Sequence, residues 1–202
     1  DFNDVLFRPK RSTLSSRKEV DMEREFTFKY SERKWKGVPI ISSNMDTVSS
    51  VSMFKKLSKH KILTCFHKFI DIKEIITAVK EGSDPQYMML STGITEPDYD
   101  KLLLNVTLLH NEDIDLQFIC IDVANGYMFK LVDFCKRIRT LFPKITLIAG
   151  SVVSREITEE LIINGKIDIV RVGIGSGAVC TTRLQTGVGI PQMSAVIECA
   201  DA

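Results

Sequence analysis

The sequence lacks the features that mark membrane, secreted and nucleic-acid-binding proteins. No apolar run approaches the roughly 20 residues that a membrane-spanning helix needs, and the first ten residues do not have the order of a signal peptide. Lys and Arg number 27 against 26 Asp and Glu, so no excess of one charge points to an acidic partner. We therefore expect a cytoplasmic protein with no nucleic-acid partner and no membrane partner.

Disulfide and metal-binding patterns are also missing. The five cysteines stand at irregular positions (65, 120, 135, 180 and 199), and no pair forms a C-x-x-C motif. An odd number at such spacings fits neither a disulfide framework nor a structural zinc site. What the sequence does contain is 44% hydrophobic residues in 202, enough for a globular core. Because the cysteine spacing fits neither structural role, at least one cysteine is a candidate catalytic residue.

Six short apolar runs rich in β-branched residues recur along the chain. They begin at residues 38, 62, 87, 118, 145 and 167, which places their starts 22 to 31 residues apart. Amphipathic helical patterns lie between them, as at Ile72, Ile75, Ile76 and Val79. Strands that are apolar throughout and alternate with helices indicate a parallel sheet covered by helices. Two α/β folds remain open, a doubly wound sheet and a (β/α)8 TIM barrel.

Polar or small residues follow nearly every predicted strand, and this favours the barrel. In a barrel the carboxyl ends of the strands converge on one site, whereas a doubly wound sheet concentrates function near one switch point. We therefore predict an α/β protein with a (β/α)8 TIM barrel that is incomplete here, with about six of eight units in residues 38–202. Residues 1–37 are predicted to be an N-terminal extension that caps the barrel, with one short half-buried strand in the alternating stretch 25–30. The residues at the strand ends are Asn44, Asp46, His67, Lys68, Thr92, Gly93, Asp122, Asn125, Gly150 and Ser151.

The stretch "GIGSGAVCTTR" at 173–183 follows the sixth predicted strand and carries one cysteine on a glycine-rich loop. Glycines permit positive φ and let the backbone approach an ion or a ligand. A cysteine reacts as its thiolate, which nearby cations and N–H dipoles favour. Cys180 is thus either a nucleophile or a small buried residue in a tight turn, and the neighbouring Thr181, Thr182 and Arg183 favour the nucleophile.

Several motifs together resemble those of the IMP dehydrogenase/GMP reductase family. They are "DFNDVLFRPKRSTLSSRKEVD", "GVPIISSNMDTV", "HK" at 67–68, "IDVANGY" and "GIGSGAVCTTRLQTGVGIPQMSAVIECADA", and they span essentially the whole chain. Two features favour the reductase branch. The first and last motifs resemble the reductase sequences more than the dehydrogenase sequences. In addition, residues 68–87 are too few for the regulatory domain that most dehydrogenases insert there.

The resemblance implies NADPH-dependent reductive deamination of GMP to IMP and ammonia through a covalent Cys180 thioimidate. It gives Thr182 a part in proton transfer at the leaving amine, together with a family glutamate beyond residue 202. A monovalent cation, K⁺, is implied at Gly175, Gly177, Cys180 and Arg183. GMP and IMP are then substrate and product, the expected assembly is a homotetramer, and these 202 residues alone are expected to be inactive.

The resemblance also implies cofactor positions. Those expected at the adenosine end of NADPH are Ser16 and Arg17, where a guanidinium suits a 2′-phosphate. Those expected on the nicotinamide side are Lys68, Asp122, Val123, Ala124, Ile174 and Gly175.

The chain departs from the family pattern near the expected site. Ser176 and Ala178 stand where the family usually has Pro and Ser, Ser151 replaces an Asn, and Phe69-Ile70 replaces His-Tyr. Two alternatives therefore stay open. One is an IMP dehydrogenase, which oxidises IMP to XMP with NAD, and the other is a non-catalytic nucleotide-binding relative.

Overall fold

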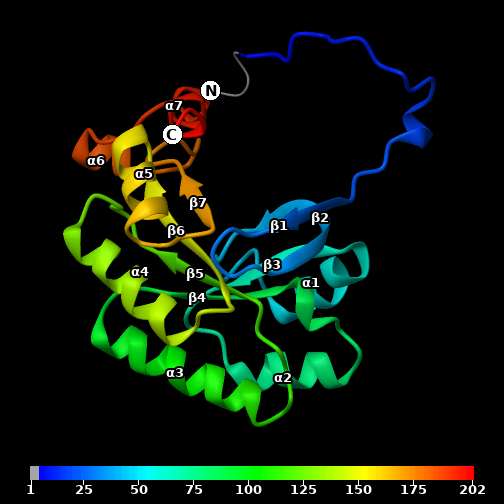
Figure 1. The fold of residues 1–202 in the computed structure, drawn as a ribbon, viewed down its shortest axis with the longest axis vertical. Coiled ribbons are helices and arrows are strands. Elements are labelled where there is room, and N and C mark those ends of the chain that lie inside the picture. Colours follow the sequence, from blue (N-terminus) through cyan, green and yellow to red (C-terminus); the bar gives the residue numbers. More distant parts are fainter. Residues whose placement is uncertain (1–4) are drawn as a thin grey trace.

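A computed structural model describes residues 5–202, which form one curled sheet with helices on its outer side (Figure 1). The sheet has seven strands that neighbour one another in sequence order. Strands β2 to β7 are parallel, and β1 is antiparallel to β2. The strands are β1 (Arg24–Thr27), β2 (Lys34–Ser42), β3 (Ile62–Phe66), β4 (Met88–Thr92), β5 (Phe118–Asp122), β6 (Thr146–Val152) and β7 (Ile169–Val172).

The helices follow the parallel strands in turn, as predicted. They are α1 (Val51–Leu57), α2 (Ile72–Lys80), α3 (Glu96–His110), α4 (Phe129–Leu141), α5 (Arg155–Ile163), α6 (Thr182–Thr186) and α7 (Gln192–Ala200), with the 3₁₀ turns η2 (Arg17–Glu19), η3 (Ser58–His60) and η4 (Pro85–Tyr87). A doubly wound sheet would reverse its strand order at a switch point, and this sheet does not. The six parallel strand-helix units therefore match the predicted incomplete barrel. No helix within residues 5–202 has the length and apolarity that a membrane crossing requires.

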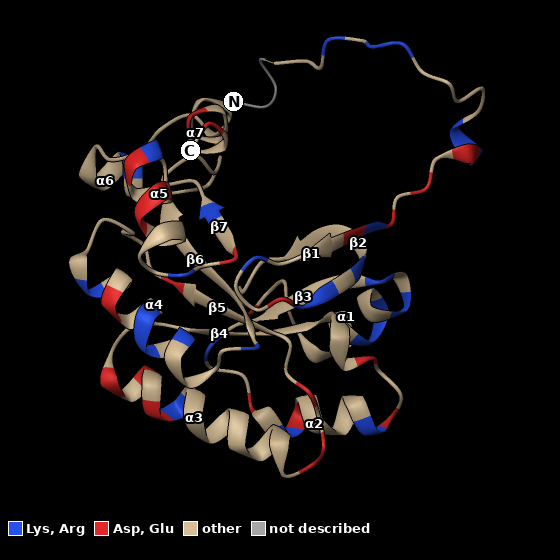
Figure 2. Cartoon of the chain, viewed as in Figure 1, with Lys and Arg blue, Asp and Glu red and all other residues tan. Residues whose placement is uncertain are grey.

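Alternation along the strands divides the core into two layers. On β5, Ile119 and Ile121 belong to the large core between sheet and helices, while Phe118 and Cys120 face the inside of the curl. Strands β3 to β6 are almost wholly buried because both of their faces are covered. Charged residues of both signs are carried largely by the outer helices and loops (Figure 2).

Aromatic side chains close the inner core at the amino ends of the strands. Trp35 is 4% exposed and meets Phe118 and Tyr87 edge to face at centroid distances of 6.2 and 6.1 Å. Phe28 packs on Phe118 at 5.7 Å. The expectation of a half-buried strand at 25–30 is thus only partly correct, because β1 ends at Thr27 and all four of its residues are exposed, Phe26 by 40%. Residues 5–20 are exposed and run outside the body of the fold (Figure 1), and the division of the chain at residue 37 stays a prediction.

A buried carboxylate joins the segment after β1 to the rest of the barrel. The Asp168 side chain is fully buried and accepts hydrogen bonds from the backbone N–H groups of Tyr30 (2.8 Å), Ser31 (3.2 Å) and Leu147 (3.1 Å). Arg139 on α4 donates at 2.6 Å to Oδ2, the oxygen that also accepts from Leu147. A buried charge with this many donors is satisfied on all sides, so it fixes the N-terminal hairpin against β6 and α4.

Candidate active site

The loop after β7 carries Cys180 on an exposed projection, residues 177–187, which we call the Cys180 lobe. Gly173 and Gly175 lead into it with φ of 130° and 70°, and Gly187 ends α6 with φ of 69°. These are left-handed conformations that favour glycine. Inside the lobe, the Cys180 N–H donates to the Gly177 carbonyl at 3.0 Å, which makes a tight turn that presents the thiol.

Cys180 is partly exposed, whereas the other four cysteines are buried. Hydrogen bonds from the Thr182 hydroxyl and backbone N–H, with the nearby Arg183 charge, lower the pKa of the Cys180 thiol. In contrast, burial raises the pKa of Cys135 to about 12. A hydrogen bond with Cys120, together with burial, raises the pKa of Cys65 well above its usual range. Thiolate chemistry is therefore favoured at Cys180 and opposed at Cys65 and Cys135.

A cavity of about 500 Å³ lies beside the lobe and collects predicted residues from helix α6 and from two loops. Thr182 comes from α6, Ala124 from the loop after β5 and Ile174 from the loop after β7. Backbone bonds hold the middle loop in place, since the Val123 N–H donates to the Gly150 carbonyl and the Ser151 N–H donates to the Val123 carbonyl, both at 2.9 Å. The lining residues are Ala124, Asn125, Tyr127, Val153, Ile174, Thr182, Thr186, Val188, Gly189 and Ile190.

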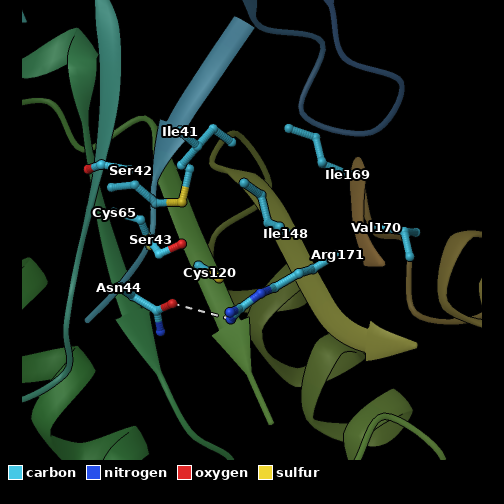
Figure 3. Close-up of a pocket in the computed structure, with 11 residues that line it drawn as sticks. Ile41, Ser42, Ser43, Asn44, Cys65, Cys120, Ile148, Ile169, Val170 and Arg171 are labelled. Atoms are coloured by element: carbon cyan, nitrogen blue, oxygen red, sulfur yellow. Dashed lines mark hydrogen bonds between the residues drawn. The ribbon is translucent and has the colours of Figure 1, made fainter. Parts of the chain in front are cut away.

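Asp122 lies in a second cluster inside the barrel mouth, with Asn44 from the loop after β2 and Arg171 from β7. Asn44 Nδ2 donates to Asp122 Oδ2 at 2.7 Å, and Arg171 pairs with Asp122 Oδ1. Arg171 also donates to Asn44 Oδ1 at 3.2 Å, which closes a ring of three side chains. Figure 3 shows Asn44 and Arg171 reaching toward each other across a cavity of about 230 Å³, whose floor includes Cys65 and Cys120. Burial opposes the charge on Arg171, but the attraction of Asp122 outweighs it and the pKa of Arg171 is raised.

Lys68 lines neither of these two cavities. Its Nζ donates to Asp98 Oδ1 at 2.9 Å and lies 5.3 Å from the centre of the Phe69 ring. Asp98 also completes a capping box with Thr95 at the start of α3. Partial burial acts against ionisation, yet the hydrogen bonds from Thr95 and Lys68 lower the pKa of Asp98. Lys68 is thus held by a helix cap at the carboxyl end of β3.

The structure does not bring Ser16 and Arg17 to these cavities. Both belong to the exposed η2 region, where the Ser16 hydroxyl accepts from the Lys18 N–H at 3.3 Å. The four residues predicted for a cation, in contrast, lie together in the lobe and its entry. Two of their carbonyls, those of Gly177 and Arg183, already accept the N–H groups of Cys180 and Gly187. Each of these two carbonyls keeps a second lone pair that can accept a further contact, and the cation itself stays a prediction.

Three functional candidates escaped the sequence reasoning. Arg171 was visible as one of two charged residues in the apolar run "IDIVRV", at the position that alternates inward with Ile169. Tyr127 donates from its hydroxyl to Ser154 Oγ at 3.0 Å and accepts from the Val153 N–H at 3.3 Å, beside the larger cavity. Gln192 binds the Val172 carbonyl and the Ser176 hydroxyl, both in the segment that leads to Cys180, and nothing in the sequence pattern indicated this role.

Comparisons with known proteins agree with this geometry. The family described as "IMP dehydrogenase / GMP reductase domain" matches residues 1–202. Over 203 aligned residues, proteins named GMP reductase from Tolumonas auensis and Vibrio vulnificus are 52% and 51% identical to the chain. The alignments cover all of this chain and 57% of each relative, so the chain spans a little over half their length. The crystal structure of inosine 5′-monophosphate dehydrogenase from Legionella pneumophila superposes with a TM-score of 0.79 at 29% identity, covering 100% of this chain and 58% of that one. The incomplete (β/α)8 barrel is confirmed.

Proposed function

The chain belongs to the IMP dehydrogenase / GMP reductase family, and from this premise we propose that it is the nucleophile-bearing part of a GMP reductase. The proposed reaction is the NADPH-dependent conversion of GMP to IMP and ammonia. The observation that carries the proposal is Cys180, a partly exposed thiol of lowered pKa beside a cavity lined by Thr182, Ala124 and Ile174. Relatives that share about half of their residues with the whole chain are named for this activity.

Cys180 acts as the nucleophile in this proposal. Its thiolate attacks C2 of the purine, the C2 amino group leaves as ammonia after taking up protons, and the purine remains bound to sulfur as a thioimidate. Hydride addition at C2 then breaks the C–S bond, which releases IMP and returns the thiolate. A thiolate is both a strong nucleophile and a good leaving group, so one difficult substitution becomes two easier steps.

Thr182 has two parts in the proposal. Its hydroxyl and backbone N–H stabilise the Cys180 thiolate before attack. Its side chain also lines the larger cavity, where it is placed to pass a proton toward the leaving amine.

NADPH, when bound, supplies the hydride. We propose that Ala124, Ile174 and the adjoining backbone of Val123 and Gly175 hold its nicotinamide end, because two of these residues line the largely apolar cavity beside Thr182. Asp122 and Lys68 remain predicted contacts for the nicotinamide side, although neither lines this cavity. Ser16 and Arg17 remain predicted contacts for the adenosine end, and the homotetramer, the bound K⁺ and the cytoplasmic location remain predictions as well.

The test compares two substrate pairs with the full-length protein. GMP with NADPH should be turned over to IMP, with loss of NADPH absorbance and release of ammonia. Turnover of IMP with NAD alone would instead assign the chain to the dehydrogenase branch. No turnover of either pair, with the nucleotides still bound, would identify a non-catalytic relative.

A further inference from the structure

The Cys180 lobe is joined to the barrel by a narrow neck, which consists of residues 172–176 on one side and 188–192 on the other. The two sides run along each other, since the Ile190 N–H donates to the Ile174 carbonyl at 3.1 Å. Ile174 is buried and packs with Val153 and Ala195 in a small apolar cluster, which Ile190 joins. The neck is therefore the better-packed part of the loop.

Gln192, the first residue of α7, binds two points on the opposite side of the neck. Its Nε2 donates to the Val172 carbonyl at 2.9 Å, and its Oε1 accepts from the Ser176 hydroxyl at 2.6 Å. One amide thus binds the backbone before the glycine-rich turn and a side chain within it. Both ends of the amide are used, so its orientation is fixed.

Gly173 makes room for this arrangement. Its φ is 130°, and a Cβ at this position would lie 2.4 Å from Gln192 Oε1. The absence of a side chain therefore lets the Gln192 amide lie against the turn. Gly173, which belongs to the predicted ligand-binding loop, therefore also has a structural role, because it packs against Gln192.

The lobe beyond the neck is held mainly by its own short-range bonds. The Cys180 N–H binds the Gly177 carbonyl, the Leu184 N–H binds the Thr181 carbonyl, and the Gly187 N–H binds the Arg183 carbonyl, at 3.0 to 3.1 Å. Val179 and Leu184 are 94% and 81% exposed, so few contacts reach from the lobe to the barrel. The position of the lobe over the cavity then depends on the neck.

We infer that Gln192 and Ser176 form a clamp that sets the position of Cys180 over the substrate without setting the reactivity of its thiol. Gln192 is thus a positioning residue that acts through the neck. The inference rests on the proposed function, because it takes Cys180 as the nucleophile that meets GMP. The position of Cys180 and the reactivity of its thiol can be tested separately, because the contacts that lower the pKa of Cys180 lie inside the lobe and the clamp lies outside it.

The experiment measures how fast iodoacetamide alkylates Cys180 in the full-length protein, with and without GMP, in four variants. Gln192→Leu removes both amide bonds, Ser176→Ala removes one, and Ser176→Thr keeps the hydroxyl. Gln185→Leu is the matched control, because Gln185 is an exposed glutamine on α6 within the lobe. Without GMP, all four should react within about twofold of the wild-type rate. With GMP, Gln192→Leu and Ser176→Ala should need at least about tenfold more nucleotide for half protection, while Ser176→Thr and Gln185→Leu should stay near wild type.

Two results would overturn the clamp. One is unchanged GMP protection in both Gln192→Leu and Ser176→Ala, and the other is a tenfold change in their rates without GMP. If Gln192→Leu fails to fold, as judged by thermal unfolding, the comparison of Ser176→Ala with Ser176→Thr decides the matter. Failure of the proposed function has another signature, because the wild type itself would then show neither GMP turnover nor GMP protection.

Discussion

Asn44 Nδ2 donates a 2.7 Å hydrogen bond to Asp122 Oδ2, although the two residues are 78 positions apart in the sequence. Arg171 pairs with the other oxygen of the same carboxylate. Asp122 is therefore held at both oxygens, by residues from the loop after β2 and from β7. A carboxylate fixed in this way is suited to orient a ligand group, because its own side chain has little freedom left.

The first prediction concerns the coupling of Arg171 and Asp122. Their side chains are 37% and 28% exposed, so solvent screens the pair only in part. Arg171→Met, Asp122→Asn and the double variant should give a coupling of about 1 kcal/mol in the free energy of unfolding, because each single change leaves the other group without its partner. Urea denaturation of the full-length protein measures it.

The control for this cycle is the Arg155–Glu159 pair on α5, whose side chains are 56% and 40% exposed. Arg155→Met and Glu159→Gln should couple by no more than about 0.5 kcal/mol. Equal coupling in the two cycles would show that the Arg171 pair is an ordinary surface ion pair.

The second prediction concerns Asp168. Asp168→Ala removes the acceptor for three backbone N–H groups and leaves the Arg139 guanidinium, 11% exposed, without its counterion. Breaking a buried pair in this way should lower the free energy of unfolding by about 3–5 kcal/mol. Asp115→Ala is the control, because Asp115 pairs with Arg33 at 2.6 Å but is 59% exposed. That variant should lose less than about 1 kcal/mol, and a similar loss in both would contradict the structural role of Asp168.

The fold could be predicted from sequence because its signal is local. Each parallel strand contains an apolar run, and the run starts at 118 and 145 match β5 and β6 within a residue. Which side chains meet inside the barrel depends on strand register, and the register shifts in β2 between Val38 and Ile41 and in β6 between Gly150 and Val152. Periodicity carries no trace of such shifts, so the meeting of Asn44 with Arg171 could not be predicted. The roles proposed for the site residues stay predictions.

The third prediction concerns the pH dependence of Cys180 alkylation. The Thr182 hydroxyl stabilises the thiolate and lowers the pKa of Cys180, so Thr182→Val should raise that pKa and move the rise in alkylation rate to higher pH. At a fixed pH below the pKa, the rate should fall roughly threefold for each half unit by which the pKa rises. The Thr182 backbone N–H and Arg183 remain, so the shift is partial. Thr186→Val, on the same helix, is the control and should leave the profile unchanged. A profile that does not move in Thr182→Val would show that its hydroxyl does not support the thiolate.

The last prediction is that Cys180→Ala abolishes IMP formation in the full-length protein while its unfolding temperature stays within a few degrees of wild type. Loss of a covalent nucleophile removes several orders of magnitude in rate, about 10⁶ for a serine nucleophile. The thiol lies on an exposed lobe and contributes little packing, so stability has little reason to change. Cys199→Ala is the matched control, because Cys199 is buried in the core and, among the described residues, its Sγ makes one hydrogen bond, to the Ser154 carbonyl at 3.7 Å. This variant should keep turnover but have a lower free energy of unfolding, since it removes a buried side-chain atom. Ammonia release followed at saturating GMP and NADPH distinguishes the two, and undiminished release by Cys180→Ala would rule out the covalent mechanism.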